Sequence, residues 1–316
     1  MGATAYRYVH LDVFTDRVFG GNQLAVFPIA GREPLAHLPH VEAPSAELMQ
    51  SIAREMSFSE CTFVFSPETP DTDARVRIFT PGKELPMAGH PTIGTAFALA
   101  HLKAVAAGRP RVVLGLGVGP VPVTLQWAGG RLVSAEMTQL KPVFGPPIGR
   151  IDLVAEALGV DARQISMTGV PVQEVSCGIP FLMVPLASRA AVDTAGLDRA
   201  GQNELRGLLG AASVEVFLFS TEPARDGATA YSRMFAPGLG VSEDPATGAA
   251  SGPLGCYLVR HGLVAPADAQ RIVNVQGVKI GRPSRIHIAI DGTPTDIRSV
   301  RVGGEAVYVG EGTIVA

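Results

Sequence analysis

The chain has 316 residues, of which 47% are hydrophobic and 17% charged, and its formal net charge is −3. This composition supplies ample material for buried cores, in two domains or one large one. The sequence has no basic stripe or run of Lys and Arg, which argues against nucleic acid as a partner. Its three cysteines, Cys61, Cys177 and Cys256, form no CxxC pair, and their odd number argues against a disulfide framework.

The N-terminal segment lacks the features of a secretory signal. Asp12, Asp16 and Arg17 stand where a signal peptide needs an apolar core. The longest apolar region, VVLGLGVGPVPVTLQW, is interrupted by Gly and Pro and is too short to span a bilayer. We therefore expect a soluble cytoplasmic protein with no membrane partner.

The first half of the chain alternates between predicted strands and two predicted helices. Short alternating runs predict strands at 8–14, 23–29, 61–65, 74–79, 112–116 and 121–127. The segment 45–56 has helical spacing of apolar residues, with Ser45 as its N-cap. The segment 91–108 is apolar nearly all round, which predicts a buried helix with Pro91 at its first position and Gly108 at its end.

The second half repeats this style. Strands are predicted at 131–137, 181–186, 214–219 and 231–236, and again from residue 271 to the end of the chain. Short helices are predicted at 151–159 and 202–210. The Pro- and Gly-rich segment 139–150 marks a break, and we place the domain boundary near it. The predicted N-terminal domain is 1–128, completed by 300–316, and the predicted C-terminal domain is 129–299.

An internal repeat connects the two halves. RIFTPG (77–82) and RMFAPG (233–238) share four of six residues. Each is followed by a loop and then by a helix start rich in small residues, AGHPTIGTAFALA and ATGAASGPLGCYL. A hexapeptide, a loop and a Gly-rich helix start in the same order predict two related domains, each a strand-rich layer around one buried helix.

Two related domains would create a cleft, which is a common place for a small-molecule site. Each domain would direct one helix N-terminus toward it, and the unpaired N–H groups and the helix dipole favour an anion there. Gly89 and Gly248 would let the backbone approach a ligand closely. The predicted ligand is therefore a small carboxylic acid.

Three titratable residues are candidates for the chemistry. His90 stands at the first helix start and can titrate near neutral pH. Asp244 lies in the matching loop of the second half. Glu60 begins a strand among apolar neighbours, where desolvation would raise its carboxyl pKa and suit it to general acid–base work. Each of these residues, taken alone, is more often structural than catalytic at such a position. The repeat strengthens the interpretation of His90 and Asp244 as site residues, but it gives no information about Glu60.

Several long motifs resemble one known family. IAREMSFSECTFVF, RIFTPGKELPMAGHPTIGTA, SRMFAPGLGVSEDPATGAASGPL, VQGVKIGRPS and the opening VFGGNQLAVF together are similar to the PhzF family, the phenazine-biosynthesis isomerases. The likeness runs from residue 6 to the closing GEGTIVA. It implies an α+β, diaminopimelate-epimerase-like fold of two similar domains, each a curled, barrel-like sheet around a central helix, with the active-site cleft between them.

The resemblance also implies a function and a set of site residues. It implies a homodimer without metal or organic cofactor that isomerises trans-2,3-dihydro-3-hydroxyanthranilate, or a similar small carboxylate, by a proton shift. The family's catalytic glutamate corresponds to Glu60, its glycine–histidine pair to Gly89 and His90, and its aspartate to Asp244. Its glycine–serine pair corresponds to Gly248 and Ala249, so this chain lacks the serine hydroxyl. Asn22, in the opening motif, completes the predicted substrate-binding residues.

Two alternatives stay open at this point. The first is an epimerase or racemase of the same fold, which would need a cysteine at each facing helix start; MAGHP and DPATGA contain none. The three cysteines fit buried structural thiols better. The second is a protein that binds a small acid without turning it over.

Other segments do not match the spacing of known binding or catalytic motifs. GLGVGP is not GxGxxG and lies between predicted strands, which argues against a dinucleotide site. GAASG is not GxSxG, so Ser251 is not a nucleophile elbow. The seven histidines show no metal-binding spacing, so no metal site is expected. Pro253 is compatible with a second helix that begins near residue 249 or later.

Overall fold

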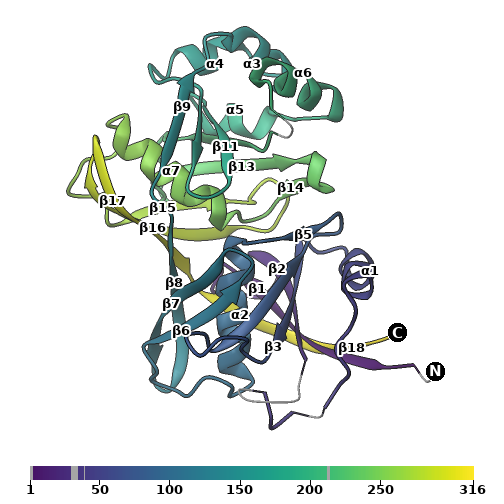
Figure 1. Ribbon diagram of the computed structural model, residues 1–316. Coiled ribbons are helices and arrows are strands. Elements are labelled where there is room, and N and C mark those ends of the chain that lie inside the picture. The colour runs from purple at the N-terminus through teal and green to yellow at the C-terminus, as the bar shows by residue number, and fades with distance from the viewer. Residues whose placement is uncertain (1–2, 30–34, 39, 212–213) are drawn as a thin grey trace. The chain divides into compact units, whose positions relative to one another are not determined.

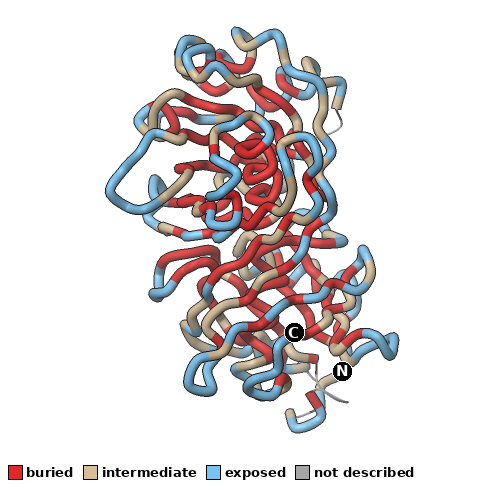
Figure 2. Tube along the Cα trace, turned by 90° about the vertical axis from the view of Figure 1, so that its left-hand side faces the viewer, coloured by how far each residue is buried: buried red, intermediate tan, exposed pale blue. Residues whose placement is uncertain are grey.

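The computed structural model describes residues 3–29, 35–38, 40–211 and 214–316. It divides the chain into two compact units: unit 1 comprises 1–138 and 303–316, and unit 2 comprises 139–302. Each unit has its own set of strands and its own central helix (Figure 1). The buried residues lie in the interior of each unit, and most connecting loops are exposed (Figure 2).

Unit 1 wraps a strongly curled sheet around the helix α2. Its helices are α1 (Ala46–Met56) and α2 (Gly89–His101). Its strands are β1 (Ala5–Val13), β2 (Asn22–Pro28), β3 (Glu60–Phe65), β4 (Ala74–Phe79), β5 (Glu84–Leu85), β6 (Arg111–Leu116), β7 (Gly119–Ala128), β8 (Arg131–Gln139) and β18 (Ala306–Val315). Strand β18 pairs with β1, so the end of the chain completes the first unit (Figure 1).

Unit 2 repeats this plan around α7 (Gly248–Arg260) and adds peripheral helices. These are α3 (Ile151–Leu158), α4 (Ala162–Ser166), α5 (Arg189–Thr194) and α6 (Arg199–Leu209), with a 3₁₀ turn at Pro237–Leu239. Its strands are β9 (Val143–Pro147), β10 (Gln173–Ser176), β11 (Pro180–Pro185), β12 (Val216–Ser220), β13 (Ala230–Ala236), β14 (Val241–Asp244), β15 (Ile272–Gln276), β16 (Ser284–Thr293) and β17 (Asp296–Gly304).

The strand pairings show that the two units are structural repeats. In unit 1, β1–β2 is antiparallel, β2–β3 parallel, β3–β4 and β4–β5 antiparallel, and β4–β6 parallel. In unit 2, β10–β11, β11–β12, β12–β13, β13–β14 and β13–β15 follow the same sequence of directions. The central helix follows the short strand β5 in unit 1 and the short strand β14 in unit 2. The predicted fold class, two similar domains with curled strands around a buried central helix in each, is confirmed.

The central helices approach their sheets closely because glycine stands at the contact. A Cβ atom on Gly94 of α2 would lie 2.5 Å from Cδ2 of Leu24, and one on Gly255 of α7 would lie 2.5 Å from Cγ2 of Ile288. Real Cβ atoms do not come so near, so a larger residue would displace these side chains. Both helices are buried over nearly their whole length, as the apolar sequence of the first one predicts.

The helix ends differ from the predictions in two places. α2 begins at Gly89, so Pro91 is its third residue, and the helix ends at His101 rather than near Gly108. Gly108 lies in a later turn, with φ +83°. α7 begins at Gly248 and keeps Pro253 inside, where the missing N–H removes one hydrogen bond from the first turns. The N-cap prediction for α1 is confirmed, because the Ser45 side chain accepts from the Leu48 N–H.

Within the described residues, no helix combines the length and the apolar character that a membrane span requires.

Candidate active site

Unit 1 gathers four of the predicted site residues at one edge of its sheet. Strands β2 and β3 are parallel neighbours, so they begin at the same edge, and their first residues are Asn22 and Glu60. α2 begins beside them with Gly89 and His90. The topology therefore brings together residues that are far apart in the sequence. Asn22, Glu60, Gly89 and His90 are called the unit 1 cluster below.

His90 lies between the other two side chains of this cluster. Nδ2 of Asn22 is 3.1 Å from Nδ1 of His90, and Nε2 of His90 is 3.4 Å from Oε2 of Glu60. The His90 ring is 3% exposed, whereas the Glu60 side chain is 15% exposed. The glutamate is thus the member of this pair that retains access to a ligand, and the histidine supports it from the interior.

Burial changes the expected role of His90. Removal from water lowers the pKa of His90 to about 3, against the opposing effect of a hydrogen bond with the Gln23 backbone. The expectation that His90 titrates near neutral pH is therefore wrong. Its ring is neutral at physiological pH and carries one proton. Because the Asn22 amide nitrogen can only donate, Nδ1 of His90 accepts from it, and the proton is on Nε2, which can donate to an oxygen of Glu60.

The start of α2 leaves backbone donors without a side-chain cap. Ala88 is the N-cap residue and supplies no capping side chain, and no acidic residue lies in the first turn. The first N–H groups of a helix have no intrahelical acceptor, and Pro91 lacks a backbone N–H group altogether. The N–H groups of Gly89 and His90 are therefore the donors that this terminus presents to an anion.

Unit 2 holds Asp244 in a buried polar network. The Thr247 hydroxyl donates to Oδ2 of Asp244 (2.6 Å), and the Gln276 amide donates to the Asp244 carbonyl (2.7 Å) and to Oγ1 of Thr247 (2.9 Å). Oε1 of Gln276 also accepts from the Thr247 N–H (3.0 Å). Asp244, Thr247 and Gln276 are all buried. This network fixes both the carboxylate and the turn that leads into α7.

The start of α7 resembles that of α2 in its lack of a cap. Thr247 is the N-cap residue, but its hydroxyl is used by Asp244 and makes no capping hydrogen bond. Nε2 of the buried Gln139 donates to the Gly248 carbonyl (2.9 Å), which ties the first turn to the sheet. Ala249 is partly exposed and offers only its backbone N–H, so the departure from the family serine removes a hydroxyl at this position.

Replacing Thr247 with Val should destabilise unit 2 without changing its shape. The substitution removes a buried hydrogen bond to a carboxylate and leaves the Gln276 amide without one acceptor. We expect the free energy of unfolding to fall by about 2 kcal/mol. Urea unfolding followed by circular dichroism measures this loss, with the exposed Thr295→Val as the matched control. Equal losses in the two variants would contradict the assigned network.

Sequence reasoning missed Gln139, Thr247 and Gln276. Gln139 lies on a strand outside the motifs and Gln276 lies within the motif VQGVKIGRPS, but only the folded register brings their amides to the start of α7. Thr247 lies inside the recognised loop, where its position next to the helix start could have indicated a polar role. Amides carry no charge and no ligand spacing, so no pattern in the sequence points to the other two.

The three cysteines are buried, as predicted. Sγ of Cys177 lies 3.9 Å from Sγ of Cys256, inside unit 2, and that contact together with burial raises the pKa of Cys256. Burial raises the pKa of Cys61 to about 12. Neither helix start carries a thiol, so none of these cysteines is placed for proton transfer there. In the described part of the chain, no group of three or more His, Cys, Asp or Glu side chains is arranged to hold a metal ion.

Several known proteins are similar to this chain over nearly its whole length. The family described as phenazine biosynthesis-like protein (PhzC-PhzF) matches residues 11–312. The trans-2,3-dihydro-3-hydroxyanthranilate isomerase of Pseudomonas chlororaphis is 37% identical over 98% of this chain and 99% of its own. The enzyme of the same name from Pseudomonas aeruginosa is 36% identical over 97% of this chain and 98% of its own.

Solved structures show the same fold. A protein described as a predicted epimerase from Pseudomonas aeruginosa is 34% identical, with a TM-score of 0.77 over 98% of this chain and 99% of that one. A PhzF-family protein from Bacillus anthracis, at 23% identity, has a TM-score of 0.82 over 99% of both chains. The predicted isomerase class is confirmed by the curated relatives. The chain belongs to the phenazine biosynthesis-like (PhzC-PhzF) family, as its motifs predict.

Proposed function

We propose that this chain is a cofactor-independent isomerase that moves a proton on a small, conjugated carboxylic acid of the trans-2,3-dihydro-3-hydroxyanthranilate type. The names of two relatives at 36% and 37% identity support this substrate class. The single observation that carries the mechanism is the contact between Glu60 and the buried, neutral His90.

Glu60 is the proposed acid–base group. Its carboxylate takes a proton from a substrate carbon, the electron pair of that C–H bond moves into the conjugated system, and the new carboxylic acid returns the proton at another carbon. The product is an isomer, so no oxidant, reductant or leaving group is required. His90 supports both states of Glu60, because its Nε2–H group can donate to an oxygen of the carboxylate or to the carbonyl oxygen of the carboxylic acid.

The remaining predicted residues serve substrate binding in this proposal. The N–H groups at the starts of α2 and α7, at Gly89 and at Gly248 and Ala249, would bind the carboxylate of the substrate. Asp244 would bind a polar group and stabilise the charge that develops in the transition state. Asn22 holds the His90 ring and thereby its orientation toward Glu60.

The placement of the thiols disfavours two-thiol epimerisation. A hydroxyproline epimerase from Agrobacterium vitis shares the fold at 13% identity, with a TM-score of 0.65. That mechanism needs a reactive thiolate at each helix start, and the cysteines here are buried elsewhere. A homodimer and a cytoplasmic location belong to the proposal as well, on the strength of the family resemblance; sedimentation would test the dimer.

Solvent exchange in D2O tests the proposed function. The protein is incubated in D2O with trans-2,3-dihydro-3-hydroxyanthranilate, and deuterium on carbon is followed by NMR. We expect product that carries deuterium, because the proton held by Glu60 exchanges with solvent before its return. Tight binding of this acid, with neither product nor deuterium exchange, would contradict the isomerase and favour a binding protein.

A further inference from the structure

The repeated hexapeptide places one arginine in the same contact in each unit. Arg77 of β4 donates through Nε to Oε1 (2.7 Å) and through Nη2 to Oε2 (2.6 Å) of Glu84. Arg233 of β13 donates through Nε to Oε1 (2.9 Å) and through Nη2 to Oε2 (2.7 Å) of Glu243. The same two nitrogens thus bind both carboxylate oxygens in each unit. Two such bonds fix the orientation of both side chains more strictly than one.

The phenylalanine of the hexapeptide completes the contact. The guanidinium of Arg77 lies over the Phe79 ring, 5.1 Å from its centroid, and that of Arg233 lies over the Phe235 ring at 4.8 Å. A cation over an aromatic face is attracted to it. Each arginine is therefore held by a ring and by a carboxylate, and we call this arrangement the arginine clamp.

Both clamps end on the segment that leads into a central helix. Glu84 is followed by Leu, Pro, Met, Ala and Gly89, and Glu243 by Asp, Pro, Ala, Thr and Gly248, so both segments read ExPxxG. Gly89 and Gly248 are the first residues of α2 and α7. A carboxylate fixed at the start of this short segment constrains where the helix begins. In unit 2, the next residue after the clamped glutamate is Asp244.

The unit 2 clamp is the more buried and the more extensively bonded. The side chains of Arg233 and Glu243 are 8% and 10% exposed, against 20% and 42% for Arg77 and Glu84. Nη1 of Arg233 also donates to three carbonyls at the end of α5, those of Val192, Asp193 and Ala195. Removal of either partner of a buried pair leaves a desolvated charge.

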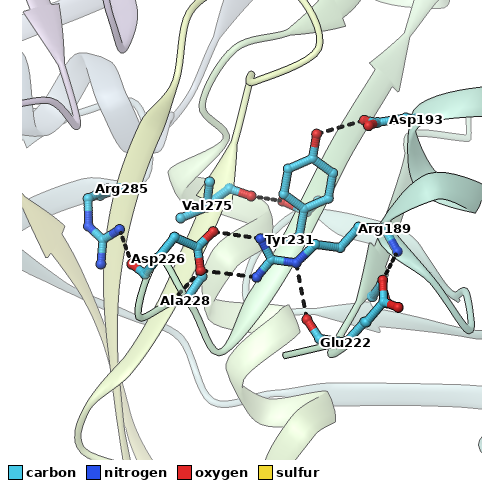
Figure 3. A network of polar contacts seen from close by, with 10 residues as sticks. Arg189, Asp193, Glu222, Asp226, Ala228, Tyr231, Val275 and Arg285 are labelled. Carbon is cyan, nitrogen blue, oxygen red and sulfur yellow. Dashed lines mark hydrogen bonds and ion pairs between the residues drawn. The ribbon is translucent and has the colours of Figure 1, made fainter. Parts of the chain in front are cut away.

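Neighbouring residues attach the same strand to α5. The Tyr231 hydroxyl, two residues before Arg233 on β13, donates to Oδ1 of Asp193 (2.6 Å) (Figure 3). Arg189, at the start of α5, lies over the Tyr231 ring and binds Asp226 through two nitrogens (Figure 3). These contacts fix the position of β13 relative to α5. Because Arg233 of β13 binds Glu243, they also fix the position of Glu243 and of the next residue, Asp244.

We propose that the arginine clamp is a positioning device for the proton-transfer reaction: Arg233 holds Glu243 so that Asp244 and the start of α7 keep their places, and Arg77 with Glu84 does the same for the start of α2. The role of Asp244 and the helix starts rests on the proposed function. The clamp residues themselves do not touch the substrate. They act by placing the groups that do touch the substrate. A displacement of such a group by about 1 Å can lower the rate about a hundredfold.

The test combines local mobility with catalysis. In Glu243→Gln, the amide keeps one of the two hydrogen bonds, so the unit folds while the clamp loosens. Hydrogen exchange read by mass spectrometry should show faster exchange at 241–249, by about tenfold, with the rest of unit 2 unchanged. kcat/KM for solvent deuterium incorporation, measured below the unfolding transition, should fall about tenfold or more, with a larger loss for Arg233→Met.

Arg150→Met is the matched control, because Arg150 also binds a carboxylate through two nitrogens, that of Asp152, but on the exposed surface of unit 2. It should change neither readout. If Glu243→Gln lowers the melting temperature while local exchange and kcat/KM stay at wild-type values, the clamp is only structural and the proposal is wrong. If the wild type shows no turnover, the proposed function fails, and the hydrogen-exchange result still decides whether the clamp positions 241–249.

Discussion

Glu60→Gln is expected to lower solvent deuterium incorporation by about a thousandfold or more, because it removes the only proposed proton carrier. The amide matches the carboxylate in size and can still contact Nε2 of His90, which lies 3.4 Å from Oε2 in the wild type. Binding of the substrate should therefore persist while the chemical step is lost. The measurement is kcat and KM for the reaction in D2O, with KM changed little.

One of the two exposed glutamates of α1, Glu55, provides the control for this experiment. Glu55→Gln makes the same chemical change in unit 1, on a side chain that faces solvent. It should leave the rate at the wild-type value. An undiminished rate of deuterium incorporation in Glu60→Gln would assign the proton transfer to another group. Asp244 would then be the first residue to examine, because it is the other carboxylate among the predicted catalytic residues.

The sequence was sufficient to predict the repeat and the fold, because both are visible as short patterns of neighbouring residues. RIFTPG and RMFAPG identify the strand before each central helix, and the apolar run after Pro91 identifies a buried helix. The helix ends were predicted less well. Pro91 is favourable in any of the first three positions, where its missing N–H costs nothing, so it could not locate the first residue.

The environment of the site residues could not be predicted in the same way. Whether His90 is protonated depends on water access, and only the fold shows that its ring is 3% exposed. Gln276 reaches Thr247 because β15 pairs with β13 in a parallel register, a relation between strands with no local pattern. The clamp is an intermediate case: the repeated arginine and the two ExPxxG segments are visible in the sequence, but the pairing of arginine with glutamate is not, since the connecting loops differ in length.

The buried His90 should make unit 1 lose stability as the pH falls. Burial holds the pKa of His90 at about 3, below the ordinary value of 6.5. Between these two values the unfolded chain binds a proton at this residue and the folded chain does not, so acid favours unfolding. The contribution changes by about 1.4 kcal/mol per pH unit, which amounts to roughly 2–3 kcal/mol between pH 6.5 and 4.5.

His90→Gln should remove this dependence, because glutamine is neutral in both states. The chain has one tryptophan, Trp127, and it lies in unit 1, so its fluorescence during urea unfolding reports on the relevant unit. The substitution also removes the contact with Asn22, but that loss shifts the whole curve and does not change its slope. Carboxylates that titrate in the same range are common to both proteins and cancel in the difference.

His40→Gln is the control, because it makes the same substitution at an exposed histidine of unit 1. We expect the stability difference between wild type and His90→Gln to change by about 2–3 kcal/mol from pH 6.5 to 4.5, and that between wild type and His40→Gln to stay nearly constant. If the free energy of unfolding depended on pH in the same way for wild type and His90→Gln, the His90 ring would take up its proton in the folded protein. A charged ring would then face Glu60, and the support of a neutral histidine for both states of that carboxyl would be lost from the mechanism.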